Sequence, residues 1–361
     1  MKNHIFLLVI SLLVFLVFPI VLAQDETGTE VIGIIQVNTT WTVENSPYYL
    51  TGPTAVDSGV TLIIEPGVTV NLNGYYIQVN GTLFAKGNDA EKVYINDGEI
   101  RFTVISNDWN ESTTTGCIIE NAVLNSTNIE IQDTSPLVNN NVFYNSLVWC
   151  IRQGSNAVSN STFVKSTIAV MEANVTISGN TIVDSLQAIW IRPGLFEIQS
   201  FPVIERNLIF GNEEGIAITN WSDDMLHSPI IRNNTIANNT CGISFELVMG
   251  AGVSPLINNN NFINNSEYNI DLSSNAHNDI NATYNWWGTT DTQTINQSIY
   301  DFKNDFTLGT VNFVPFLTEP NPNAPSIPTD IIPEFTSWVI LTILLAVSLL
   351  GLIVRKKSNV P

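Results

Sequence analysis

Basic residues are scarce in this chain. It has 13 Lys and Arg against 33 Asp and Glu in 361 residues, which gives a formal net charge of −20. Four of the basic residues and none of the acidic ones lie in the two end segments, 1–23 and 338–361. Residues 24–337 therefore carry nine basic and 33 acidic residues, a net charge of −24. A surface of this sign repels phosphates, so we expect no nucleic-acid partner.

Residues that bind metals or form disulfides are also few. The chain has three cysteines, Cys117, Cys150 and Cys241, at spacings unlike those of a metal site. At most one disulfide can form, so the third thiol must be buried or pair with another chain. Only three histidines and four methionines occur, and His227 and His277 lie far apart, which argues against a copper-delivery site. We expect no cofactor and no metal site, and stability that comes from a long core.

The first 23 residues have the pattern of a secretory signal. Lys2 precedes an apolar stretch from Ile5 to Leu22, and Ala23 stands at the boundary with a polar segment. The alternative is an uncleaved anchor helix, because the apolar run is almost long enough to cross a bilayer. Both interpretations place the following residues outside the cell.

The other end predicts a membrane anchor. Residues 338–354 are uninterruptedly apolar and Trp338 stands at an interfacial position, while residues 355–361 contain a basic triplet that should stay cytoplasmic. Before them, residues 319–337 are rich in proline and predict a semi-rigid extended stalk. We expect the protein on the extracellular face, tethered by one C-terminal helix.

Asparagine is abundant, with 45 residues. Twelve asparagines begin an Asn-x-Ser/Thr sequon without proline, and an exported chain can carry glycans at such sites. They are Asn38, Asn80, Asn110, Asn125, Asn160, Asn174, Asn220, Asn233, Asn238, Asn264, Asn281 and Asn296.

An internal repeat predicts the architecture. An Asn-rich turn followed by an apolar anchor residue recurs at spacings of 19 to 27 residues, and a second apolar strand follows each anchor. The anchors are Phe143, Phe163, Ile182, Ile209, Ile236 and Phe262. The repeat is too short for a β-α-β unit, and its short Asn-, Thr- and Ile-rich runs are poor helix formers. We therefore predict an all-β parallel β-helix over residues 24–318, right-handed by the general bias of parallel crossovers. Asparagines should occupy its corners, and the end coils should act as caps.

Several segments resemble a known family. The opening NTTWTVENSPYYLTGP and GVTLIIEPGVTVNLNGYYIQVNGTLFAKG, the repeated NNxF and NNTI, and the closing NWWGTTD and VNFVPFL resemble right-handed parallel β-helix repeat proteins of archaeal surfaces. They are similar to the pectin-lyase-like and periplasmic NosD-type families. The resemblance covers about residues 31–318 and implies the fold. It leaves the function open, because these families include lyases, hydrolases, metal-delivery proteins and adhesins. The tail from Pro333 to Trp338 looks like an archaeal C-terminal sorting signal.

Aligning the second strands of the repeat predicts two columns of outward residues. One column is Cys150, Val170, Trp190, Ala217, Ser244 and Asn269. The other column is Arg152, Glu172, Arg192, Thr219, Glu246 and Asp271. Residues in one column should touch across strands about 4.8 Å apart. The charges in the second column can equally be a solvated ladder of ion pairs with little effect on stability.

A ligand groove is the functional interpretation of these columns. Three insertions, 193–201, 220–228 and 247–254, follow the second strand and would wall the charged column. The expected ligand-binding residues are Arg152, Glu172, Trp190, Arg192, Trp221 and Glu246. The expected partner is polysaccharide or another glycan of the cell envelope.

Two other functions remain open at this stage. A calcium-assisted polysaccharide lyase or a glycoside hydrolase would use the same face, and its candidate catalytic residues are Arg192, Asp223, Asp224 and Glu246. The carboxylates show no clear cluster of the kind that hydrolases need, and no nucleophile elbow, phosphate loop or zinc motif occurs. We therefore expect a binding protein rather than an enzyme. A purely structural envelope component is the third possibility.

Overall fold

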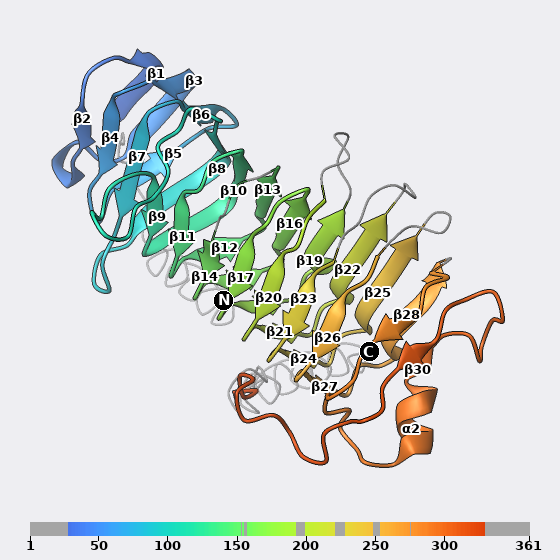
Figure 1. Ribbon diagram of the computed structural model, residues 1–361. Coiled ribbons are helices and arrows are strands. Elements are labelled where there is room, and N and C mark those ends of the chain that lie inside the picture. Colours follow the sequence, from blue (N-terminus) through green and yellow to red (C-terminus); the bar gives the residue numbers. More distant parts are fainter. Residues whose placement is uncertain are drawn as a thin grey trace, which may run out of the picture. The chain divides into compact units, whose positions relative to one another are not determined.

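The chain folds into coils of short parallel strands (Figure 1). The computed structural model describes residues 28–152, 154, 157–192, 199–220, 228–247, 253–274 and 276–328. These form two compact units, residues up to 176 with 189–202, and residues 177–188 with 203 onward. The predicted all-β parallel β-helix is confirmed in both units.

The first unit opens with coils of longer strands, which lie in the segment predicted to hold the opening coils. These elements are β1 (Thr29–Ile35), β2 (Thr39–Trp41), η1 (Val43–Asn45), β3 (Tyr48–Val56), β4 (Thr61–Ile64), β5 (Thr69–Asn71), β6 (Tyr76–Val79), β7 (Thr82–Lys86), β8 (Val93–Phe102), β9 (Ile118–Glu120) and β10 (Ala122–Gln132).

The later coils of this unit each have three short strands. We call the three stacks that equivalent strands of successive coils form, in chain order, the first, second and third faces. They are β11 (Leu137–Asn139), β12 (Val142–Tyr144), β13 (Leu147–Ile151), β14 (Ala157–Ser159), β15 (Thr162–Val164), β16 (Thr167–Met171) and, from Ile189, β19 (Gln187–Arg192). Alternate side chains point inward and stack on the same position of the next coil. The Phe143 and Phe163 rings, for example, stack at 4.5 Å between centroids.

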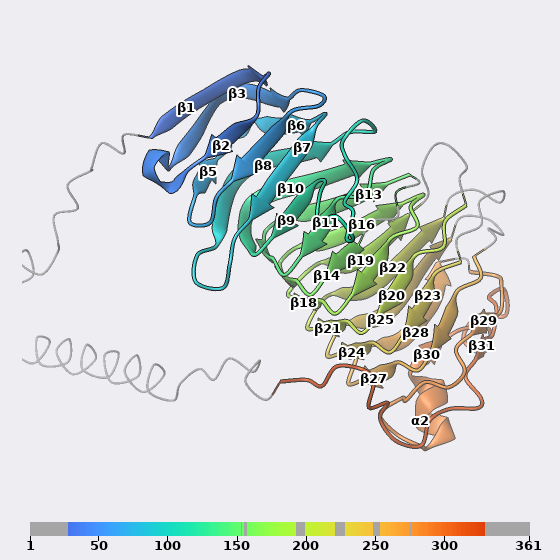
Figure 2. The ribbon, with the colours of Figure 1, turned by 60° about the vertical axis from the view of Figure 1, so that its left-hand side comes forward.

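The second unit repeats the same three faces (Figure 2). Its strands are most of β17 (Thr176–Ser178), β18 (Thr181–Val183), β20 (Val203–Glu205), β21 (Leu208–Phe210), β22 (Glu214–Asn220), β23 (Ile230–Arg232), β24 (Thr235–Ala237), β25 (Cys241–Leu247), β26 (Leu256–Asn258), β27 (Asn261–Ile263), β28 (Tyr268–Ser274), β29 (Ile280–Asn281), β30 (Ile299–Tyr300) and β31 (Val311–Asn312). One short helix, α2 (Thr292–Gln297), begins at Asp291, whose side chain caps it.

Asparagine ladders hold the corners of the second unit. At the corner between the first and second faces, each buried asparagine accepts hydrogen bonds from the one before it, as in Asn180 N–H to Asn207 Oδ1 at 2.9 Å. The ladder continues through Asn234, Asn260 and Asn285. The residue before each ladder position has a left-handed backbone, for example Asn233 at φ 55°. The predicted corner role of asparagine is confirmed, because the ladder asparagines bond across coils and two of the left-handed positions, Asn233 and Asn259, are also asparagines.

The segment predicted to act as the C-terminal cap lies against the last complete coil. Trp287 is buried and its ring stacks on Phe262 at 4.8 Å, which closes the core of the last complete coil. Asn285 ends the asparagine ladder by donating to Ile257 O and Ala282 O. β31 pairs in parallel with β29 and covers its edge. Such an end keeps the terminal coil from exposing core and unpaired backbone groups.

The start of the expected stalk lies against the second unit instead of standing free. Residues 319–328 run along β27 and β24, and Asn321 and Pro325 form hydrogen bonds with these strands. The reason is the polar surface that the strands offer, since Asn261 and Thr235 bond to the proline-rich backbone. We call residues 319–328 the strap. The rest of the stalk, residues 329–337, lies outside the described residues.

Two expectations about the chain ends fall on residues that the structure does not describe, namely 1–23 and 338–361. Among the residues that it describes, no helix has both the length and the apolar character to cross a membrane. The three cysteines all lie in described strands or their flanks, are buried, and form no disulfide.

Candidate functional site

The outward surface of the third face in the first unit carries a continuous column of large polar and aromatic side chains. The backbone register pairs Gln78 with Arg101, Arg101 with Glu130, Glu130 with Trp149, Trp149 with Ala169, and Ala169 with Trp190. Five steps of strand spacing make this column about 24 Å long. We call it, together with Arg192, the platform.

At the aromatic end of the platform, two tryptophans lie on either side of a small residue. Trp149 and Trp190 flank Ala169, whose side chain is a single methyl group and is buried. The guanidinium of Arg192 fills the space above Ala169, 4.5 Å from the ring centre of Trp190 and 5.8 Å from that of Trp149. Burial lowers the pKa of Arg192. Cation–π attraction to the two indole rings favours this position of the guanidinium.

The charged end of the platform is built around Arg101. Its Nε and Nη2 donate to Glu99 Oε2 at 2.7 and 2.5 Å, and its guanidinium lies 4.2 Å from the ring centre of Tyr76. The hydrogen bond with Glu99 raises the pKa of Arg101. The guanidinium of Arg101 is therefore held in one orientation on the outward surface of the third face.

Glu130 lies between the two ends of the platform. It is beside Arg101 and Trp149 in the register and is half-buried. Burial, and then the charge of Glu99, raise its pKa, against the opposing effect of Arg101. A carboxyl group of this kind can exchange its proton at a higher pH than an exposed glutamate.

A shallow hollow continues this surface toward the first coils. It has a volume of about 210 Å³ and shares Tyr76 and Gln78 with the neighbourhood of Arg101. The other lining residues are Gly33, Ile34, Pro53, Thr54 and Ala55. The hollow and the platform together form one elongated surface, as an extended polymer would require.

The structure corrects the predicted columns in part. Ala217 pairs with Ser244 and Thr219 with Glu246, as predicted, but the other steps that the register tests from Trp190 onward differ. Cys150 and Val170 pair with each other but are buried in the core, so they do not share an outward column with Trp190. Trp190 pairs with Ala169, and Arg192 pairs with Met171 instead of Glu172. The physical reason is a longer corner before β19, where the extra residues include Leu186, which is 68 % exposed.

The other predicted site residues lie in different places. Arg152 and Glu172 follow the ends of β13 and β16 with left-handed backbones, φ 64° and 56°. Arg152 forms an ion pair with Asp133 at 3.1 Å, and Glu172 is buried. Both border the platform rather than stand in it.

The second unit does not repeat the aromatic pattern. Glu246 is exposed on β25, where it pairs with Thr219 and Ser274, and Ser244 pairs with Asp271 rather than Asn269. The outward neighbours Ala217 and Thr219 are buried. Trp221, Asp223 and Asp224 lie outside the described residues, as does most of each predicted insertion.

Sequence reasoning missed Trp149, Glu130, Arg101 and Glu99. A usable signal was present, because Trp149-Cys150-Ile151 and Trp190-Ile191-Arg192 align on their tryptophans. That alignment gives the observed register, whereas aligning the arginines shifts β19 by one residue. Within the described part of the chain, no group of three or more His, Cys, Asp or Glu side chains could hold a metal ion.

A comparison with protein families agrees with the fold. A family model described as "Right handed beta helix region" matches residues 103–247. The crystal structure of pectate lyase Pel9A is similar with a TM-score of 0.34 and 11% sequence identity, and the match covers 83% of this chain and 83% of that chain. No curated protein matches the sequence significantly. The family match and the parallel coils together identify the chain as a right-handed parallel β-helix.

Proposed function

We propose that this protein binds polysaccharide, or another hydroxyl-rich polymer of the cell envelope, along the platform. The observation that carries the proposal is the column from Arg101 to Trp190, in which two tryptophans hold the Arg192 guanidinium between them. Sugar rings have apolar C–H faces that pack on indoles, and their hydroxyls accept hydrogen bonds from fixed arginine forks. A rigid column of such groups suits an elongated ligand.

We also propose that the chain acts outside the cell. The signal-like residues 1–23, the apolar residues 338–354 and the basic tail 355–361 support export followed by tethering through a C-terminal helix. The resemblance of the opening, closing and tail segments to archaeal surface proteins supports the same location. Envelope glycans are abundant at that location, and we propose them as the ligand of the platform.

A binding and product screen tests the proposal. The full chain, purified in detergent, is titrated with a panel of polysaccharides in the presence of calcium, and released reducing ends and unsaturated uronates are followed in the same samples. We expect saturable binding without products. No binding to any polysaccharide of the panel contradicts the proposal and favours a structural envelope component.

Glycoside hydrolysis is the second candidate, and Glu130 is the observation that favours it. Hydrolysis requires an acid that keeps its proton and a nearby ionised carboxylate. Glu130 has a raised pKa, and Glu99 lies on the adjacent strand, two residues before Arg101, the register partner of Glu130. Products that disappear in Glu130→Gln while binding persists would establish this reaction.

A lyase would depend on other residues. It would lose product formation in Arg192→Ala and retain binding, with Asp223, Asp224 and Glu246 as the remaining catalytic candidates and calcium as the optional cofactor. Products that persist in Arg192→Ala rule this mechanism out.

A further inference from the structure

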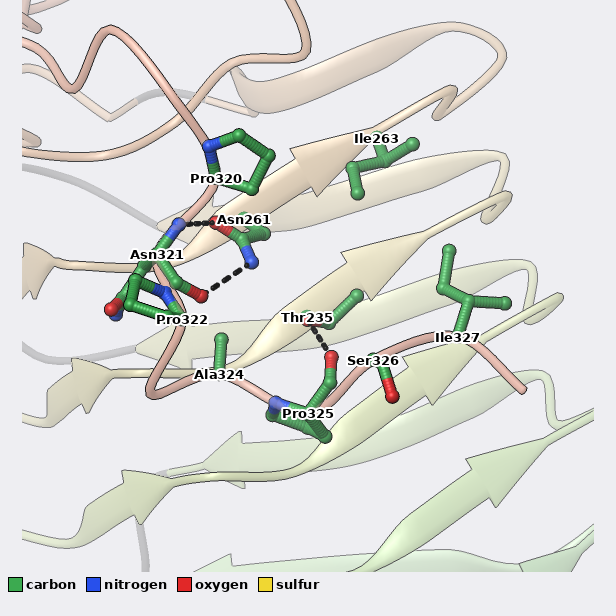
Figure 3. A pocket seen from close by; sticks show the side chains of 10 residues that line it. All are labelled: Thr235, Asn261, Ile263, Pro320, Asn321, Pro322, Ala324, Pro325, Ser326 and Ile327. Atoms are coloured by element: carbon green, nitrogen blue, oxygen red, sulfur yellow. Dashed lines mark hydrogen bonds between the residues drawn. The ribbon is translucent and has the colours of Figure 1, made fainter. Parts of the chain in front are cut away.

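The strap lies over Thr235 (Figure 3), the last residue of one of the twelve sequons, Asn233-Asn234-Thr235. Asn321 Nδ2 donates to Asn233 Oδ1 at 2.9 Å and to Asn259 O at 2.5 Å. The Thr235 hydroxyl donates to Pro325 O at 2.5 Å, and Thr235 is 1 % exposed. Both groups that define the sequon, the asparagine amide and the hydroxyl two residues later, are thus engaged by residues 321–325.

Further bonds hold the strap in this place. Asn321 N–H donates to Asn261 Oδ1 at 2.8 Å, and Asn261 Nδ2 donates back to Asn321 O at 3.2 Å. Asn321 itself is 8 % exposed. Two of these four bonds come from the Asn321 side chain, to Asn233 and Asn259, so Asn321→Ala removes them and should weaken the docking of this part of the strap.

The first unit contains an equivalent sequon that no strap covers among the residues that the structure describes. Asn160-Ser161-Thr162 stands at the equivalent corner, directly before the second-face strand β15, as Asn233-Asn234-Thr235 does before β24. The backbones match, with φ 50° at Asn160 and 55° at Asn233. Asn160 is exposed and Thr162 is half-buried. In the described residues, the one side-chain bond of Asn160 runs to Asn139 Oδ1, at 2.9 Å.

We propose that Asn160 is an acceptor for an N-linked glycan and that the docked strap keeps the equivalent Asn233 unmodified. The inference depends on the export proposed above, since it requires a compartment with a lipid-linked sugar phosphate donor. In the transfer, Nδ2 of the asparagine forms a bond to the anomeric carbon. The bond from that carbon to the carrier phosphate breaks, the phosphate leaves with the electron pair, and one amide proton passes to a base of the transferring enzyme.

The geometry makes glycan and strap mutually exclusive at Asn233. A sugar on Nδ2 of Asn233 would occupy the space next to Oδ1 that Asn321 fills, and the transferring enzyme would have to reach a hydroxyl that the strap buries. The strap therefore selects between two sequons that are alike in sequence and backbone.

Site-resolved occupancy tests the proposal. The full chain is produced in a secreting host that glycosylates Asn-x-Ser/Thr, and peptides containing Asn160 and Asn233 are quantified by mass spectrometry after enzymatic deglycosylation in heavy-oxygen water. We expect Asn160 to be modified and Asn233 to be unmodified. In Asn321→Ala, occupancy of Asn233 should rise severalfold while that of Asn160 stays constant.

Two further variants serve as controls for the Asn321→Ala result. Asn323→Ala is the matched control, because Asn323 is an exposed strap asparagine that uses only its backbone N–H to contact Asn321. Replacing residues 319–328 by a Gly/Ser segment of equal length removes the strap if Asn321→Ala folds poorly. Three results would overturn the proposal. They are equal glycan occupancy of the two sequons in the unaltered chain, an Asn160 without glycan, and an Asn233 that remains without glycan after the strap is removed. Failure of export appears separately, as absence of the protein from the medium and membrane.

Discussion

At the scale of single residues, the platform depends on side chains that meet across strands and are distant in sequence. Trp149 and Trp190 are two coils apart, yet both contact the Arg192 guanidinium. Their geometry depends on the methyl side chain of Ala169, because any longer side chain there would occupy the space of the guanidinium. Substitutions in this group should change ligand affinity more than stability.

Removal of either tryptophan should weaken ligand binding. Trp149→Ala or Trp190→Ala removes an indole face and the support of Arg192, and we expect the Kd for the bound polysaccharide to rise about tenfold, ~1.4 kcal/mol. Isothermal titration checks this value. Tyr144→Ala is the control, because Tyr144 is 41 % exposed on β12, outside the platform. An unchanged Kd in both tryptophan variants would place the ligand elsewhere.

Glu130 should make stability depend on pH. Burial, and then Glu99, raise its pKa above the ordinary 4.5. The folded chain then holds this proton at pH values where the unfolded chain has lost it. Stability should accordingly fall as the pH rises from about 4.5 through the raised pKa, and level off above it.

The substitution Glu130→Gln isolates this contribution. It removes the ionisable group, so the decrease in stability with rising pH should become smaller. At pH values above the raised pKa of Glu130, the variant should be more stable than the unaltered chain. Urea unfolding at several pH values measures both effects. In Glu120, hydrogen bonds from Lys86 and Asn139 outweigh burial and lower the pKa, so Glu120→Gln should act in the opposite direction. Parallel pH profiles for the Glu130 variant and the unaltered chain would contradict the assignment.

At the scale of elements, the corners determine which residues face outward. The inward Val170 follows the inward Phe163 by seven positions, but the corner before β19 is longer, and its Leu186 is exposed. This difference moves Arg192 beside Met171. The asparagine ladders of the second unit keep each corner in place, since a ladder side chain satisfies two backbone groups of the preceding coil, as Asn212 does for Ser185 N–H and Ile182 O.

Removal of one ladder asparagine should be costly. In Asn212→Ala, the Ser185 N–H and the Ile182 carbonyl lose their partner, which is buried at 3 % exposure. We expect destabilisation of about 3 kcal/mol, from the cost of leaving two buried groups unpaired. Thermal and urea unfolding measure it. Asn296→Ala, at an exposed position of α2, should change stability little. A loss of similar size in both variants would show that the ladder has no special role.

At the scale of the whole molecule, stability comes from long stacks of coils without disulfides. Cys117 and Cys150 are buried in the first unit and Cys241 in the second. Burial raises the pKa of Cys117 to about 11 and also raises that of Cys241. Neutral, buried thiols react slowly, so they report on the opening of the coils around them.

Thiol labelling should therefore follow unfolding. At pH 8 without denaturant, we expect iodoacetamide to label none of the three cysteines over the time in which a free thiol reacts fully. In urea, Cys117 and Cys150 should become reactive at one midpoint, because both lie in the stack of the first unit. Mass spectrometry of pulse-labelled peptides measures each site. Rapid labelling of the native chain would contradict the burial seen here.

The sequence by itself determined the fold class and the use of asparagine at the corners. These features repeat from coil to coil, and each follows from a local property such as alternating apolar residues or the tolerance of asparagine for left-handed backbone. Only the tertiary structure decided which residues form the platform and that residues 319–328 form a strap. Both depend on pairing between distant segments. A corner that differs in length by one or two residues shifts a whole strand, and Asn321 finds its partners about 60 and 90 residues away.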